Sequence, residues 1–226
     1  MRFVALHGAD KTDGLGIRAD DGGDEEEPFM RTNGKTRMST RTMVLGAVMT
    51  AMVILLQLVG TYTTFFGPFS TALALIPIII GAALCGWGIG AWLGLVFAVV
   101  VMASGGAALF FAFNIIGTVV TVIAKGMACG FAAGLVYKLL ARVNDTVAVV
   151  TASLVCPVVN TAVFLLGCAI FFLPHAEGIA STLNMNVSGM ALFWALAMGN
   201  FLFEIGLSVV LSPVIVRLLQ IRKRAR

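Results

Sequence analysis

The residues best suited to chemistry are a lysine and a glutamate that lie inside long apolar runs of the chain. Lys125 lies in the run from 114 to 142, and Glu204 lies in the run from 190 to 219. A charge in hydrocarbon is costly, so such residues generally face the interior of a helix bundle and meet a partner there. Lys125 could contact a ligand, form a structural ion pair with Glu204, or extend its ammonium group to the membrane–water interface. These three roles stay open.

The run that holds Lys125 predicts one helix with two different faces. At 100° per residue, three polar residues fall on the same narrow arc as Lys125, namely Asn114, Thr118 and Thr121. A second arc carries small residues at four-residue spacing, namely Gly126, Gly130 and Gly134. Small residues at this spacing let another helix approach closely. We therefore expect a polar face and a packing face on this helix.

Further polar residues interrupt the later apolar runs. Asn200, Glu204 and Ser208 follow each other at four-residue steps, and Asn160 lies in the run before them. Glu204 is the natural counter-charge for Lys125. Such a pair either fixes the register of the two helices or binds substrate, and both roles stay open. An intramembrane asparagine usually bonds a neighbouring helix, for about 0.6 kcal/mol on average. Contact with a ligand is the alternative for Asn160.

Aromatic residues gather near one predicted interface. The first interpretation of Tyr62 and Trp194 is an aromatic belt at the membrane surface. The second is a wall that stacks on a ring-bearing ligand. The segment LFFAF leads into the helix of Lys125 as an aromatic approach.

The composition identifies an integral membrane protein. The 226 residues are 59% hydrophobic and 12% charged, whereas a soluble domain has about 25% charged residues. Four cysteines lie in apolar runs without the spacing of metal ligands, so they indicate small buried side chains. We expect no metal and no cofactor.

Six apolar runs predict an all-α protein with six transmembrane helices. They cover roughly Thr42–Val59, Phe69–Leu84, residues 88–103, residues 114–141, Thr146–Phe172 and Met190–Leu219. With six spans, the lysines and arginines at the ends of the runs all fall on one side, and the opposite loops carry none. The positive-inside rule makes that side cytoplasmic and places both termini there.

The chain divides by composition at residue 37. Residues 1–37 hold eight acids and six bases, whereas residues 38–226 hold three acids and nine bases. Residues 1–37 fit a disordered cytoplasmic tail, or sequence upstream of a true start at Met30 or Met38. Residues 38–226 form the predicted membrane domain. Its basic excess is a signal of membrane orientation, so we expect no nucleic-acid partner.

Several activities lack their motifs. The chain has no phosphate loop of the form G-x-x-x-x-G-K-[ST], no H-E-x-x-H and no G-x-S-x-G. We therefore expect no enzyme activity and no catalytic residue in this chain.

From residue 38 to the C-terminus the sequence resembles the substrate-binding (S) components of energy-coupling factor (ECF) vitamin transporters. The segments that carry the resemblance are RTMVLGAVMTAMVILL with Ala47 and Ala51, ALIPIIIGAALCGWGIGAWLG, AKGMACGFAAGLVYKLL, PVVNTAVFLLG with Asn160, and GNFLFEIGLSVVLSPVI with Asn200 and Glu204.

The resemblance implies a multi-pass subunit of the prokaryotic plasma membrane that captures a vitamin or related micronutrient from outside. Its partners would be a transmembrane coupling protein and two cytoplasmic ABC-type ATPases, which would supply the ATP hydrolysis. Ala47 and Ala51 would dock on the coupling protein. The implied ligand site comprises Asn114, Lys125, Asn160, Asn200 and Glu204, with Tyr62 and Trp194 as walls. A single cation, Lys125, suits a carboxylate ligand such as pantothenate.

Two other classes stay open from the sequence. A self-sufficient secondary transporter could use Glu204 as a proton carrier. A membrane scaffold would bind no small molecule and would tolerate a Lys125→Leu substitution.

Overall fold

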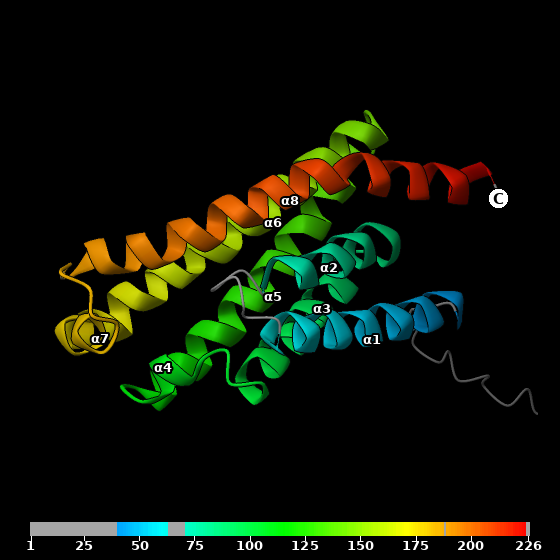
Figure 1. Ribbon diagram of the computed structural model, residues 1–226. Helices are drawn as coiled ribbons and strands as arrows, with labels where there is room; N and C mark the ends of the chain where they lie inside the picture. The colour runs from blue at the N-terminus through cyan, green and yellow to red at the C-terminus, as the bar shows by residue number, and fades with distance from the viewer. Residues whose placement is uncertain (1–39, 63–70, 188, 225–226) are drawn as a thin grey trace, which may run out of the picture. The chain divides into compact units, whose positions relative to one another are not determined.

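The computed structural model describes residues 40–62, 71–187 and 189–224 of the chain (Figure 1). The chain divides into two units, Met1–Arg37 and Met38–Arg226, and the described residues all belong to the second. The predicted tail, residues 1–37, lies outside the described residues.

Every regular element within the described residues is helical, which confirms the all-α class for this part of the chain. The long helices are α1 (Thr40–Tyr62), α5 (Ile115–Leu140), α6 (Asp145–Gly167) and α8 (Met190–Arg224). The shorter helices are α2 (Thr71–Cys85), α3 (Trp87–Ala103), α4 (Ala108–Phe111) and α7 (Ala176–Thr182). A π-helical turn, Cys168–Phe172, and a 3₁₀ turn, Leu173–His175, join α6 to α7.

The helices differ in their capacity to cross a bilayer. Among the described residues, 4 stretches are long and apolar enough, namely Thr40–Thr61, Ile115–Leu140, Asp145–Thr182 and Met190–Arg217. The helices α2 and α3 have 15 and 17 residues, fewer than the roughly 20 that a 30 Å hydrocarbon core requires. Four of the six predicted spans therefore correspond to helices that are long enough to cross the bilayer.

The short helix α2 is surrounded by other helices. It packs against α1, α3, α5, α6 and α8, and its side chains from Ala74 to Ala82 are mostly buried. Because protein rather than lipid covers most of this helix, its length is less constrained by the bilayer. Gly86 alone separates α2 from α3, with a φ of +94° that favours glycine.

The helices α3 and α5 meet along two facing rows of glycine, which confirms the predicted packing face. Gly90 lies against the backbone carbonyl of Gly130, and Gly94 lies against that of Gly126. A Cβ atom on any of these four residues would collide with the opposite backbone. The third residue of the row, Gly134, packs against the first residue of α3. The contact therefore depends on the absence of side chains at these positions.

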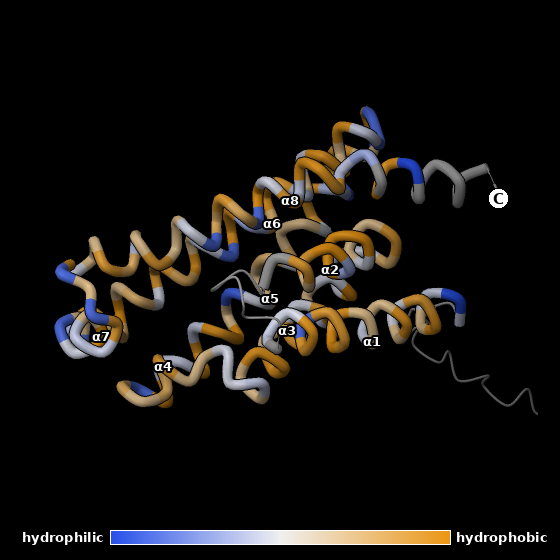
Figure 2. The backbone as a smooth tube through the Cα atoms, viewed as in Figure 1, coloured by the Kyte–Doolittle hydropathy of each residue, from blue (hydrophilic) through white to orange (hydrophobic). Residues whose placement is uncertain are grey.

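The described unit has two apolar cores. The larger one joins α2 and α3 to parts of α1, α5, α6 and α8, and it includes Phe97 and Ile215. The smaller one joins α7, the π-helical turn and the start of α8, and it includes Phe172 and Phe193. Figure 2 shows hydrophilic residues at the helix ends and short hydrophilic breaks part-way along the long helices.

The segment Leu173–Gly189 is less irregular than the sequence predicts. The segment lies between the last two predicted spans, and its first half forms the 3₁₀ turn and α7. Ala176, Ile179 and Ala180 lie on one face of α7 and are buried in the smaller core. This apolar face keeps the segment helical.

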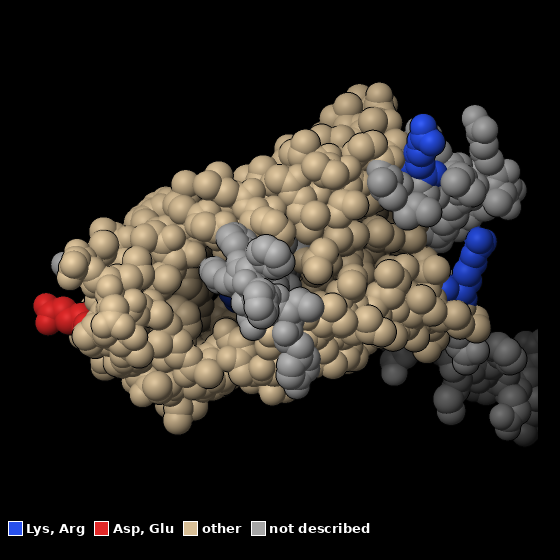
Figure 3. All heavy atoms as spheres, in the orientation of Figure 1, with Lys and Arg blue, Asp and Glu red and all other residues tan. Residues whose placement is uncertain are grey.

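Basic side chains gather at one end of the described unit (Figure 3). The start of α1, the turn between α5 and α6, and the last third of α8 lie toward that end (Figure 1). These elements carry Arg41, Lys138, Arg142 and Arg217. A red acidic group marks the opposite end in the same view, where α7 carries Glu177.

Candidate functional site

A buried carboxylate joins α6 to α8. Glu204 is 1% exposed and accepts hydrogen bonds from the amide groups of Asn160 and Asn200. The Asn160 Nδ2 atom lies 3.3 Å from Oε1 and 3.4 Å from Oε2 of Glu204. Hydrogen bonds to an ionised group are stronger than neutral ones, so the two amides stabilise this buried charge.

Lys125 of α5 approaches the same cluster by a different interaction. Its ammonium nitrogen lies 5.3 Å from the ring centre of Phe164, which follows Asn160 one turn later on α6. Within the described residues, no group accepts a hydrogen bond from this ammonium, and its side chain is partly exposed. A cation on an aromatic face that keeps its N–H donors can hold a carboxylate.

The polar residues lie between the two apolar cores. Along α6, Asn160 stands between Cys156 of the larger core and Phe164, which packs on the smaller one. Along α8, Glu204 stands between Leu196 at the smaller core and Ile215 of the larger. The polar layer therefore lies part-way along the helices. Figure 3 shows the surface hollowed on the face drawn, with the blue of a basic side chain inside the hollow.

Aromatic rings form a wall that we did not predict from the sequence. Phe110 of α4 contacts Phe164 and Phe172 edge-to-face, with ring centres 5.6 and 5.0 Å apart. Phe164 also carries the contact with Lys125. The signal in the sequence was the LFFAF segment, which contains Phe110 but gives no sign of the distant rings that it meets.

Asn114 begins the helix of Lys125 instead of continuing its polar stripe. Its φ of −154° is extended, its side chain accepts a hydrogen bond from the backbone N–H of Gly117 at 2.8 Å, and its amide donates to the carbonyl of Phe171. This is the arrangement of a helix N-cap. Its predicted contact with a ligand stays a prediction.

The threonines of the stripe are covered by neighbouring helices. Thr118 and Thr121 are 1% and 4% exposed. Thr118 donates to the backbone carbonyl of Asn114 at 2.6 Å, and the side chain of Thr121 occupies the space left by Gly167 of α6. Of the stripe, Lys125 is therefore the residue that reaches the cluster around Glu204.

Two buried oxygens near this region lack hydrogen-bond donors among the described residues. They are Oγ1 of Thr121 and Oδ1 of Asn160. Buried polar atoms are nearly always paired, so each such atom calls for an explanation. The Oδ1 atom of Asn160 therefore stays available as an acceptor, while the Nδ2 atom of the same side chain binds the carboxylate of Glu204.

The remaining predicted site residues lie elsewhere. Trp194 is 52% exposed near the start of α8, and Tyr62 is the last residue of α1, with a side chain outside the described ones. Ala47 and Ala51 are both exposed on α1, away from the face on which Val53 is buried. Their predicted docking role agrees with this exposure and stays a prediction.

Comparison with known proteins gives one match. A family model described as ECF transporter, substrate-specific component, matches residues 41–216. Searches of the curated proteins and of the solved structures found no match. The matched range contains the candidate residues on α1, α5, α6 and α8. The chain therefore belongs to the family of substrate-specific components of ECF transporters.

Proposed function

We propose that this chain captures a small carboxylate-bearing micronutrient of the vitamin class from outside the cell, for ATP-driven uptake with partner subunits. The observation that carries this proposal is Lys125, a cation inside the bundle whose ammonium donates no hydrogen bond to a described residue. As a member of its family the chain is a substrate-binding membrane subunit, not an enzyme, and it works with the membrane and ATPase subunits of an ECF transporter.

The chemistry around Lys125 supports a ligand of mixed character. The ammonium offers N–H donors to a carboxylate, and the rings of Phe110 and Phe164 offer an apolar wall beside it. Oδ1 of Asn160 is an acceptor for a hydroxyl or amide N–H of the ligand. Pantothenate, which combines a carboxylate with hydroxyl and amide groups, is the reference ligand for this proposal. Binding sites commonly combine apolar walls with few polar groups in this way.

The arrangement in the membrane is part of the proposal. We place six spans in a prokaryotic plasma membrane, with α2 and α3 as short spans inside the bundle and both termini in the cytoplasm. The gathering of basic residues at one end supports that orientation (Figure 3). The partners are a transmembrane coupling protein, bound through Ala47 and Ala51, and two cytoplasmic ABC-type ATPases. The family match gives no support to a proton-coupled transporter that uses Glu204.

The test begins with the protein purified in detergent. Mass spectrometry of the small molecule released on denaturation identifies the ligand, and thermal shift against a vitamin panel confirms it, because binding to the native state raises its stability. We expect a carboxylate-bearing vitamin at near-stoichiometric level. Failure of every vitamin to bind would contradict the capture of a micronutrient.

The role of Lys125 is tested by substitution. Lys125→Ala should weaken ligand binding by about 10- to 100-fold, because hydrogen bonds to charged groups contribute roughly 1.5–3 kcal/mol. Lys138→Ala is the matched control, since Lys138 lies in the last turn of the same helix. Isothermal titration measures both dissociation constants. Equal affinity of the Lys125→Ala variant and the wild type would contradict the carboxylate assignment.

A further inference from the structure

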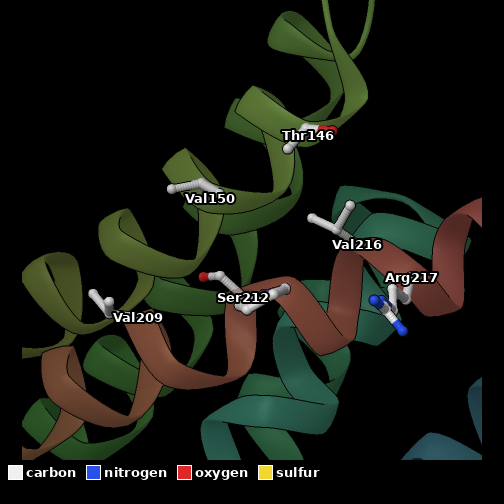
Figure 4. A pocket seen from close by; sticks show the side chains of 7 residues that line it. Thr146, Val150, Val209, Ser212, Val216 and Arg217 are labelled. Atoms are coloured by element: carbon white, nitrogen blue, oxygen red, sulfur yellow. The ribbon is translucent and has the colours of Figure 1, made fainter.

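A groove on the outside of the bundle separates α6 from α8 near the basic end. Its volume is about 500 Å³, and its walls are mostly apolar (Figure 4). The lining residues are Thr146, Val150, Val209, Ser212, Pro213, Val216 and Arg217. This groove belongs neither to the cluster around Glu204 nor to the exposed alanine face of α1.

The floor and the opening of the groove have identifiable causes. Ser212 bridges to Ser153 of α6 at 2.8 Å and donates to the carbonyl of Ser208, so its hydroxyl group is satisfied inside the helix pair. Pro213 lies inside α8 and has no N–H group for the carbonyl of Val209, one turn earlier. The side chains of Val209 and Val150 that border the groove are exposed to the surroundings of the bundle.

The length of the groove suits one half of a bilayer. From Val209 to Arg217 the helix rises about 12 Å, at 1.5 Å per residue. Half of a typical hydrocarbon core is about 15 Å. The apolar walls are therefore long enough to cover most of one leaflet, and Arg217 lies at one end of them.

The charge at this end is positive. Among the described side chains there, four are basic, namely Arg41, Lys138, Arg142 and Arg217, and one is acidic, namely Asp145. Arg217 is exposed at the mouth of the groove, and no described residue forms a hydrogen bond or ion pair with it. An apolar trough that ends in a cation complements an amphiphile with an anionic head.

We propose that the groove binds an anionic phospholipid from the leaflet on the basic side. One acyl chain lies against Val150, Val209 and Val216, and the phosphate binds the guanidinium group of Arg217. Thr146 offers a hydroxyl group on the opposite wall. The lipid bridges α6 and α8 at their cytoplasmic ends. These are the two helices that are joined by the hydrogen bonds between Asn160 and Glu204.

The test uses the full chain in detergent, with phosphatidylglycerol and phosphatidylcholine of identical acyl chains as probes. Native mass spectrometry measures how much of each lipid the protein retains over a titration. We expect tighter retention of phosphatidylglycerol. Arg217→Gln should weaken the binding of phosphatidylglycerol about fivefold, because one basic residue near anionic headgroups contributes about 1 kcal/mol. The binding of phosphatidylcholine should not change. Arg41→Gln removes the same charge at the same end, outside the groove, and should retain wild-type affinity.

A second variant tests the apolar walls. Val209→Trp places an indole in the groove at an exposed position, so the fold should persist and retention of both lipids should fall. Size-exclusion chromatography and thermal unfolding check that each variant is folded. Equal losses in Arg217→Gln and Arg41→Gln would overturn the proposal, because general charge would then explain binding. Unchanged lipid retention in a folded Val209→Trp variant would overturn it as well.

Discussion

Glu204 is the most constrained ionisable side chain in the described unit. It is 1% exposed, and its carboxylate accepts hydrogen bonds from Asn160 and Asn200. The sequence suggested Lys125 as its counter-charge, but the hydrogen bonds described above come from the two amides. Lys125 is thereby left with N–H donors for another acceptor.

Removal of Glu204 should destabilise the protein strongly. Glu204→Leu takes away the acceptor of the buried Asn160 amide and of the partly exposed Asn200 amide, and the negative charge near Lys125. We expect a loss of about 3–5 kcal/mol. Adding Lys125→Met to this variant should recover part of the loss, because it removes a cation that has lost the opposite charge near it. Denaturant unfolding in detergent micelles measures both effects.

An exposed acid provides the control. Glu177→Leu on α7 should change the free energy of unfolding by less than about 0.5 kcal/mol. The Lys125→Met single variant completes the cycle. If the loss in the double variant equals the sum of the losses in the two single variants, Lys125 and Glu204 do not interact.

The polar cluster of the candidate site could be predicted from the sequence in part. Charge and amide groups inside apolar runs sufficed to select Lys125, Asn160 and Glu204. Such residues are costly to expose to lipid, so they face the interior of the helix bundle. The capping role of Asn114 was not foreseen, since the stripe pattern assumed that the helix had already begun there. The wall at Phe110 depends on tertiary contacts between α4 and α6, which no local pattern encodes.

At the scale of the helices, α3 and α5 pack backbone against backbone. The opposing carbonyls of Gly94 and Gly126 occupy the space of the missing Cβ atoms. Packing of this kind gains dispersion energy from backbone atoms, which are rigid, so it cannot adapt to an added methyl group.

Gly94→Ala should therefore reduce stability by about 1–3 kcal/mol or more, because overpacking displaces one of the two helices. Gly199→Ala is the control, since a Cβ atom there meets no atom within 4 Å. We expect this control to be neutral or slightly stabilising. Thermal unfolding in detergent compares the two variants, and equal midpoints would contradict the close packing of α3 on α5.

The helices themselves were predictable where apolar runs were long. The glycine row on α5 correctly indicated a packing face, because spacing alone defines it. The helix α7 was missed because its apolar residues, Ala176, Ile179 and Ala180, cover less than two turns between Pro174 and a polar segment. So short a pattern gains its stability from the smaller core and not from its own sequence.

At the scale of the whole molecule, α1 presents an apolar outer surface. Val44, Ala47, Val48, Ala51 and Leu55 are all exposed on it. The two alanines leave this surface flat over one turn, which suits the close approach of a helix from another subunit. This surface is the proposed docking site for the coupling protein.

A double substitution tests docking. Ala47→Leu with Ala51→Leu should lower recovery of the coupling protein in co-purification at least about tenfold, because larger side chains hold the partner helix away. The isolated subunit should keep its stability and its ligand affinity. Ala195→Leu, at an exposed alanine of α8, is the control. Normal recovery of the double variant would place the docking surface elsewhere.

The glycine contact also bears on biogenesis. The whole of α3 leaves the ribosome before its partner surface on α5 is complete at Gly134, 31 residues later. At about 5–20 residues per second, α3 waits roughly two to six seconds for that surface. During this interval a 17-residue helix with an open glycine face lacks the protein neighbours that later compensate for its shortness. We therefore expect α2 and α3 to stay beside the insertion machinery until α5 has been made.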